Sequence, residues 1–350
     1  MIMCMNPGNE HDHLKGIVLE IQRMSTEDGP GLRTTIFFKG CALRCSWCHN
    51  PESISPHPQV QWVGSRCIGC KTCLDVCPEN ALSEGPEGIL IDRDRCKGCG
   101  TCTRECPSTA LELLGRVWTP DELAREVAKD KAYFDQSRGG VTASGGEAAL
   151  QAPFVAAFFK ACRERGVSTA LDTSGECPWS ALEGILPHAD LVLFDIKEID
   201  PEKHRAFTGR SNERILRNLR RVRDWMRQNL TPRTLWIRTP VIPGATDREE
   251  NIIGIGRFLA AHLGDTVTRW ELCAFNNLCR DKYTRLGLDW PFREADLLPR
   301  DVMERLAQVA EATGLEPGVV HWSGATRRLQ ETSPAEDNDT GLRLVKGCPA

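Results

Sequence analysis

The stretch DGPGLRTTIFFKGCALRCSWCHNPES, residues 28–53, decides how the rest of the chain is interpreted. Its β-branched run TTIFF, at 34–38, predicts a buried strand, and three cysteines follow it directly, Cys41, Cys45 and Cys48. A 4Fe-4S cluster normally takes four cysteine ligands, so three leave one iron open to an exogenous ligand. The spacing C-x3-C-x2-C therefore predicts an iron-sulfur site that does chemistry, with these cysteines as the candidate catalytic residues.

Zinc is the alternative metal for these three thiolates, with His49 as a more distant fourth ligand. Structural zinc sites usually combine two paired sets of ligands. This stretch offers one set, so the iron-sulfur interpretation is favoured.

Outward from this stretch the chain alternates strand and helix patterns. Apolar or β-branched runs predict parallel strands at 34–38, 140–144, 168–173, 191–196, 235–242 and 269–275. Amphipathic patterns predict helices at 120–137, 153–166, 179–187, 212–228, 248–263 and 299–314. Repeated βα units of this kind indicate an α/β fold around a parallel sheet. Six units are too few for the usual eight-fold closed barrel, so we predict a partial (β/α)6 barrel with its site at the carboxyl ends of the strands.

Composition limits the class of protein. The chain has 350 residues, 41% apolar and 26% charged, with a net charge of -4, which argues against an electrostatic nucleic-acid binder. No apolar run is long enough for a membrane span, and the N-terminus lacks the apolar core of a signal peptide. We therefore expect a cytoplasmic protein. In a reducing compartment, its 17 cysteines are expected to hold metal rather than form disulfides.

A second group of cysteines forms an internal repeat. CIGCKTCLDVCP at 67–78 and CKGCGTCTRECP at 96–107 both read C-x2-C-x2-C-x3-C-P. This is the bacterial two-cluster ferredoxin run, in which the fourth cysteine of each motif ligates the other cluster. We therefore predict one 4Fe-4S cluster on Cys67, Cys70, Cys73 and Cys106, and another on Cys96, Cys99, Cys102 and Cys77. Zinc is again the alternative, but the doubled spacing matches iron-sulfur usage far better.

These patterns divide the chain into two structural parts. We expect residues 15–56 and 117–331 to form the partial barrel, residues 57–116 to form an inserted ferredoxin-like module, and the termini, 1–14 and 332–350, to be mobile. The helix from Pro120 has a clear start signal, because Thr119 can cap it and Glu122 can complete a capping box.

The stretch 28–53 closely resembles the signature of the glycyl-radical-enzyme activating enzymes, a branch of the radical S-adenosylmethionine (SAM) superfamily. VTASGGE at 141–147, LDTSG at 171–175 and DIK at 195–197 resemble the family's SAM-binding segments in the same order. ERILRNL, RTPVIPGATDREENI and KYTRLG match further family segments, so the resemblance runs from about residue 16 to about residue 290.

The resemblance implies a set of SAM-binding residues: Trp47, Gly145, Gly146, Glu147, Asp172, Thr173, Ser174, Asp195, Lys197, Arg238 and Asn276. Paired glycines let peptide groups approach the SAM ammonium, and Lys197 and Arg238 can neutralise its carboxylate. Asp172, Thr173 and Asp195 lie where family members place a monovalent cation. Two positions depart from the family pattern, since Ala148 replaces a proline and Asn276 replaces a histidine.

The implied activity is that of an oxidoreductase that reductively cleaves SAM. Its 5'-deoxyadenosyl radical would take hydrogen from a backbone glycine of a separate glycyl radical enzyme. The resemblance implies three 4Fe-4S clusters, SAM and a flavodoxin or ferredoxin-type electron donor, with no nucleic-acid or membrane partner. Because of the insert, pyruvate formate-lyase is disfavoured as the partner. The CAFNNLCRDKY variant at 273–283 favours a sulfonate or arylalkyl-type lyase.

Two alternatives stay open at the level of sequence. One is a radical SAM enzyme that modifies peptides or metabolites with the help of auxiliary clusters, although the complete set of eight insert cysteines speaks against a vacant auxiliary site. The other is an electron-transfer protein of the ferredoxin type. The insert itself can relay electrons, dock the partner or stabilise the fold, and we favour the relay.

Overall fold

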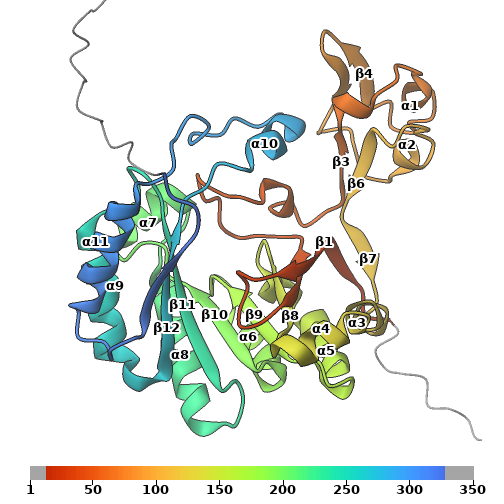
Figure 1. Cartoon of the computed structure of the whole chain (residues 1–350). Helices are drawn as coiled ribbons and strands as arrows, with labels where there is room; N and C mark the ends of the chain where they lie inside the picture. Colours follow the sequence, from red (N-terminus) through yellow and green to blue (C-terminus); the bar gives the residue numbers. More distant parts are fainter. Residues whose placement is uncertain (1–12, 328–350) are drawn as a thin grey trace, which may run out of the picture.

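The computed structural model describes residues 13–327 and is built on a nine-stranded sheet (Figure 1). The strand order is β13-β12-β11-β10-β9-β8-β2-β1-β7. The parallel strands are β2 (Arg33–Phe38), β8 (Gly140–Gly145), β9 (Thr169–Thr173), β10 (Leu191–Asp195), β11 (Thr234–Val241), β12 (Val267–Ala274) and β13 (Val320–Ser323). β1 (Gly16–Ser25) and β7 (Arg116–Trp118) run antiparallel at one edge. The sheet is open, as a partial barrel requires.

Helices cover the outer face of this sheet (Figure 1). They are α3 (Pro120–Ala128), α4 (Lys131–Ser137), α5 (Ala152–Glu164), α6 (Trp179–Ile185), α7 (Pro201–Thr208), α8 (Glu213–Gln228), α9 (Glu249–His262) and α11 (Arg300–Glu311), whereas α10 (Arg280–Leu286) lies above the sheet, toward the insert. Their apolar stripes pack on the strands in one core that includes Phe158 of α5, Leu219 of α8 and Leu306 of α11, all fully buried.

Strand β11 shows how the two-residue period positions the site. Leu235 and Ile237 are fully buried and belong to the core under the helices. Arg238, one residue on, points to the opposite face, which lines a cavity inside the barrel. The same alternation lets a single strand stabilise the fold and supply a functional side chain.

All six predicted parallel strands are confirmed, and the structure adds three strands to this sheet that the sequence patterns did not reveal. β13 is four residues long, too short for a periodic signal, and its place comes from pairing with β12. The predicted helix 120–137 is two helices, broken at Asp130. The Asp130 carboxylate is buried there and accepts hydrogen bonds from Arg23 and Thr34. α7 was also missed, although Asp200 caps its first backbone N–H groups.

The insert stands apart from the helical layer and is drawn at the upper right of Figure 1. β3 (Gln59–Trp62) pairs with β6 (Leu111–Leu114), and β4 (Leu82–Gly85) with β5 (Gly88–Ile91). Two single-turn helices, α1 (Thr72–Asp75) and α2 (Thr101–Arg104), lie within the two cysteine motifs. A small core of its own includes Val60, Cys73, Cys102 and Leu111.

The internal repeat of the insert extends to its backbone. Left-handed conformations recur 29 residues apart, at Gly69 and Gly98, at Lys71 and Gly100, and at Asn80 and Thr109. Non-glycine residues adopt this conformation rarely. The two halves therefore have one backbone design.

The termini expected to be mobile, 1–14 and 332–350, lie outside the described residues except for His13 and Leu14. Within residues 13–327, no helix combines the length and the apolar character that crossing a bilayer requires.

Candidate active site

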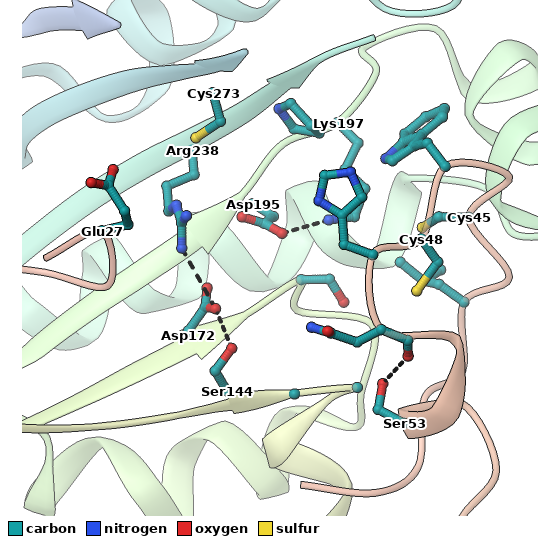
Figure 2. A pocket seen from close by; sticks show the side chains of 18 of the residues that line it. Glu27, Cys45, Cys48, Ser53, Ser144, Asp172, Asp195, Lys197, Arg238 and Cys273 are labelled. Carbon is teal, nitrogen blue, oxygen red and sulfur yellow. Dashed lines mark hydrogen bonds and ion pairs between the residues drawn. The ribbon is translucent and has the colours of Figure 1, made fainter. Parts of the chain in front are cut away.

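A cavity of about 440 Å³ opens at the carboxyl ends of the parallel strands (Figure 2). It is lined by Cys41, Cys45 and Cys48 together with ten of the eleven residues that the resemblance assigned to SAM: Trp47, Gly145, Gly146, Asp172, Thr173, Ser174, Asp195, Lys197, Arg238 and Asn276. The structure thus brings together residues that are up to 235 positions apart in the chain.

The loop that carries the three cysteines is held by backbone hydrogen bonds. Gly40 N–H donates to the carbonyl of Ser53 at 2.7 Å, and Ser46 N–H donates to Phe207 at 2.9 Å, just inside the end of α7. The phenol of Tyr283, on α10, donates to the carbonyl of Cys48 at 2.8 Å. Elements far apart in the sequence therefore position the cysteine loop at the cavity.

Burial dominates the ionisation of these thiols. It raises the pKa of Cys41 to about 12 and raises the pKa values of Cys45 and Cys48 as well. The nearby Lys197 ammonium opposes these shifts. Metal ligation requires thiolates, so binding of a cluster here must release protons.

The glycines after β8 allow close contact with the cysteine loop. Gly145 has a φ of +111°, and a Cβ there would lie 2.2 Å from the backbone nitrogen of Phe38. A Cβ on Gly146 would lie 2.3 Å from the carbonyl oxygen of Gly40. Any side chain at either position would therefore collide with the backbone at or beside this loop. At these two positions, therefore, only backbone faces the cavity.

Glu147 has a different position from the one expected. It does not line the cavity, and its buried carboxylate accepts hydrogen bonds from Thr173 Oγ1 at 2.6 Å and from Ser174 N–H and Oγ at 2.9 and 2.7 Å. Glu147 thus joins the end of β8 to the end of β9. It is a positioning residue for the two segments that do line the cavity.

The end of the cavity away from the thiols holds both signs of charge (Figure 2). Arg238 Nη1 lies 3.6 Å from Asp172 Oδ2 and 3.7 Å from Asp28 Oδ1, and Ser144 donates to Asp172 at 2.6 Å. Lys197 Nζ lies 2.5 Å from Asp195 Oδ2. This group of charges can bind a zwitterion, because Arg238 and Lys197 can pair with its carboxylate and the neighbouring aspartates can pair with its ammonium.

The pKa values at this end follow from the same contacts. Burial raises the pKa of Asp172 to about 7, against the opposing charge of Arg238. Burial also works against the charged form of Lys197, yet Asp195 and the Cys45 thiolate raise the pKa of that ammonium above its usual value. Lys197 is therefore a permanent cation between the charged end of the cavity and the cysteine loop.

Among the cavity residues that sequence reasoning left without a role are Glu27, Asp28 and Ser144, and Cys273 also lines the cavity, as its place at a predicted strand end near the site allowed. Asp28 had a signal, since it begins the DGPGLR segment, and its carboxylate accepts 2.6 Å hydrogen bonds from Ser25 and Thr35. Cys273 lies beside Arg238 because β11 and β12 are neighbours (Figure 2). His49 also lines the cavity, and its Nε2 has no hydrogen-bond partner among the described residues.

The insert cysteines gather in two sets. Cys67, Cys70, Cys73 and Cys106 line one small cavity beside Trp62. In the other set, burial raises the pKa of Cys102 to about 11, and the neighbouring thiols of Cys77, Cys96 and Cys99 add to the shift. Each set takes its fourth member from the other motif. Within residues 13–327, no three His, Cys, Asp or Glu side chains lie close enough together to hold one metal ion. A 4Fe-4S cluster is larger than one ion, so its cysteine ligands lie farther apart.

The radical SAM superfamily model matches residues 93–254, a 4Fe-4S dicluster domain matches 66–110, and a 4Fe-4S single cluster domain matches 27–74. The (2S)-3-sulfopropanediol dehydratase activating enzyme of Klebsiella oxytoca is 40% identical over 85% of this chain and 93% of its own length. The chain belongs to the glycyl-radical-enzyme activating enzymes.

Further relatives of this family are similar over comparable lengths. The isethionate sulfite-lyase activating enzyme of Oleidesulfovibrio alaskensis is 39% identical over 85% of this chain and 95% of its own length. The indoleacetate decarboxylase activating enzyme of Tractidigestivibacter scatoligenes is 36% identical over 88% of this chain and 98% of its own length. As a member of this family, the chain is a radical SAM enzyme that uses 4Fe-4S clusters and SAM.

Proposed function

We propose that this chain activates a glycyl radical enzyme from the cavity at the ends of its parallel strands. The observation that carries the proposal is that a three-cysteine loop and a two-sign charged group line the same cavity, while two four-cysteine sets lie outside it. Three thiolates leave one iron open for SAM. When bound, the cluster and SAM supply the 5'-deoxyadenosyl radical, which takes hydrogen from a glycine of the partner. The protein contributes orientation and exclusion of water.

Individual roles follow from chemistry and position. Arg238 and Lys197 are suited to the SAM carboxylate, Arg238 by a planar two-point contact. The peptide groups of Gly145 and Gly146 are suited to its ammonium. Asp172, Thr173 and Asp195 would hold a monovalent cation beside the carboxylate. Trp47, Ser174 and Asn276 would complete the binding surface.

The proposal includes three clusters, one on Cys41, Cys45 and Cys48 and two on the insert sets. About 12 iron atoms per chain are then expected. It also divides the chain into a barrel of residues 15–56 and 117–331 and a ferredoxin-like insert of residues 57–116. The complete insert sets speak against the alternative of a modifying enzyme that holds its substrate on a vacant auxiliary iron.

For the partner, we propose a glycyl radical enzyme that acts on a sulfonate. Two of the relatives named above are described as activating enzymes of a sulfopropanediol dehydratase and of an isethionate sulfite-lyase. Pyruvate formate-lyase is disfavoured because of the insert. A flavodoxin or ferredoxin-type protein would supply the electron.

The test uses the anaerobically reconstituted chain with SAM and a reductant. We expect 5'-deoxyadenosine and methionine, and a glycyl radical signal in electron paramagnetic resonance (EPR) when a sulfonate-cleaving glycyl radical enzyme is added. Cys48→Ala should abolish both, whereas Cys162→Ala, in the core of α5, should abolish neither. SAM cleavage without any glycyl radical on sulfonate, arylacetate or diol-type partners would overturn the activase proposal and favour a modifying enzyme.

A further inference from the structure

The two cysteine motifs of the insert share a backbone but differ in their surroundings. Gly69 and Gly98 occupy the same repeat position, with φ values of +71° and +63°. A Cβ on Gly69 would meet no described atom within 4 Å, whereas a Cβ on Gly98 would lie 2.2 Å from the carbonyl oxygen of Pro58. Pro58 lies just before β3, in the segment that leads from the cysteine loop into the insert. The second motif is therefore packed on the first residues of the insert, which follow directly from the barrel's cysteine loop, whereas no described atom packs on Gly69 of the first motif.

An arginine strengthens this packing on the second motif alone. Arg93, three residues before Cys96, donates to the carbonyl of Val60 and, at 3.2 Å, to the carbonyl of Arg285 on α10. The equivalent position of the first motif, 29 residues earlier, is Gly64, which has no side chain. Arg93 thus connects the second motif by a hydrogen bond to α10, which lies outside the insert.

The same helix, α10, also binds the loop of the three catalytic cysteines through hydrogen bonds and an ion pair. Tyr283 donates to the carbonyl of Cys48 at 2.8 Å. Lys282 Nζ lies 2.8 Å from Asn50 Oδ1 and 2.7 Å from Glu52 Oε1. The contacts therefore run without a break from the second motif, through Arg93 and α10, to Cys48.

From these contacts we propose that Gly98, Arg93 and α10 form the interface that docks the insert on the barrel, with the second motif facing inward. The set of Cys96, Cys99, Cys102 and Cys77 is then the inner one, and the set of Cys67, Cys70, Cys73 and Cys106 is the outer one. A low-potential one-electron donor protein is oxidised by one electron at the outer set. That electron passes inward and reduces the SAM site. This inference rests on the proposed function and adds to it the direction of electron transfer, from the outer set of cysteines to the inner set and then to the SAM site.

The experiment compares Gly98→Ala with Gly69→Ala in the full, anaerobically reconstituted chain. Both glycines have positive φ, so both variants carry backbone strain, but only Gly98→Ala meets a backbone atom. Hydrogen exchange should rise in residues 58–62 and 280–286 in Gly98→Ala and stay unchanged in Gly69→Ala. Freeze-quenched EPR should show that reduction of the SAM site by flavodoxin hydroquinone slows about tenfold in Gly98→Ala alone. Reduction by dithionite should stay within about twofold of the unmodified chain in both variants.

Equal exchange and equal reduction rates in the two variants would overturn the proposal, and so would slowing confined to Gly69→Ala. If Gly98→Ala loses iron or fails to fold, Arg93→Lys provides the second test against Arg95→Lys, because Arg95 is exposed and its side chain makes no such contact in the described structure. Unchanged exchange in Arg93→Lys then overturns the interface. Should the unmodified chain fail to cleave SAM with either reductant, the proposed function fails, while the exchange data still judge the interface.

Discussion

The barrel loop and the insert hold cysteines in different environments, although Cys73 and Cys102 of the insert are buried too. In the barrel, Cys41, Cys45 and Cys48 face a cavity, and burial raises their pKa values. In the insert, Cys70 and Cys99 are exposed, and hydrogen bonds from Thr72 and Thr101 lower their pKa values. The insert has four thiols per set, and the barrel loop has three beside a space for a molecule. Under the proposed function, the same side chain would therefore hold a closed cluster in one region and an open one in the other.

The largest expected effect is loss of the barrel site while the insert keeps its iron. Cys45→Ala removes a ligand from the open site, so the iron content should fall from about 12 to about 8 atoms per chain and SAM cleavage should vanish. Iron analysis and assay of 5'-deoxyadenosine measure both changes. Substantial SAM cleavage in Cys45→Ala would show that the chemistry takes place elsewhere.

Arg238→Ala should weaken SAM binding without disturbing the insert. The variant leaves the SAM carboxylate without its two-point cation and leaves Asp172 without its counter-charge, which should raise the Kd about a hundredfold. Equilibrium binding of SAM to the loaded chain measures the change. Arg217→Ala, on the exposed face of α8, is the matched control and should leave the Kd unchanged.

Cys99→Ala should affect the insert and leave the barrel site intact. About four iron atoms should be lost, while SAM cleavage driven by dithionite should stay within about twofold. Cleavage driven by flavodoxin hydroquinone should fall about tenfold. Parallel assays with the two reductants make the distinction, and undiminished cleavage with both would reduce the insert to a structural or docking role.

Asp172 gives a pH-dependent effect confined to the barrel cavity. Burial raises the pKa of its carboxyl from 3.8 to about 7. A carboxyl that binds its proton more tightly when folded costs stability progressively as the pH rises from the unfolded to the folded pKa. In the SAM-free chain, Asp172→Asn should therefore gain in Tm relative to the unmodified chain between pH 5 and pH 8. A Tm difference that is constant over this range would contradict the raised pKa.

The smallest expected effect lies outside both regions. Thr119 caps α3 in a complete capping box with Glu122. Thr119→Ala should cost about 1 kcal/mol in the free energy of unfolding and change neither iron content nor SAM cleavage. Denaturant unfolding measures the first, and the assays above measure the second. A loss of iron in this variant would mean that the cysteine sites depend on remote helix stability.

The sequence predicted the parts of the molecule that have local patterns. The six central strands follow from their apolar runs, and the capping box at Thr119 follows from its spacing. Spacing also predicted the two insert sets, although the pairing of motifs came from the known ferredoxin run. The assignment of SAM-binding residues came from resemblance, and the structure then brought all but Glu147 to one cavity.

Other features could not be predicted because they depend on tertiary contacts. The break at Asp130 comes from its hydrogen bonds to Arg23 and Thr34, which lie nearly a hundred residues or more away. Gly69 and Gly98 have the same sequence context, and only the folded chain shows that one of them is packed on Pro58. Repeated motifs therefore specify a repeated backbone, but not a repeated environment.

The most direct test of the central claim is EPR and electron-nuclear double resonance on the reduced, cluster-loaded chain with SAM labelled with ¹⁵N at its amino group and ¹⁷O at its carboxylate. The account predicts that SAM shifts the signal of the cluster on Cys41, Cys45 and Cys48, with hyperfine coupling to both labels. The signals of the insert clusters should stay unchanged. An unshifted spectrum of the barrel cluster without coupling to either label, or coupling that appears on an insert cluster, would contradict the account.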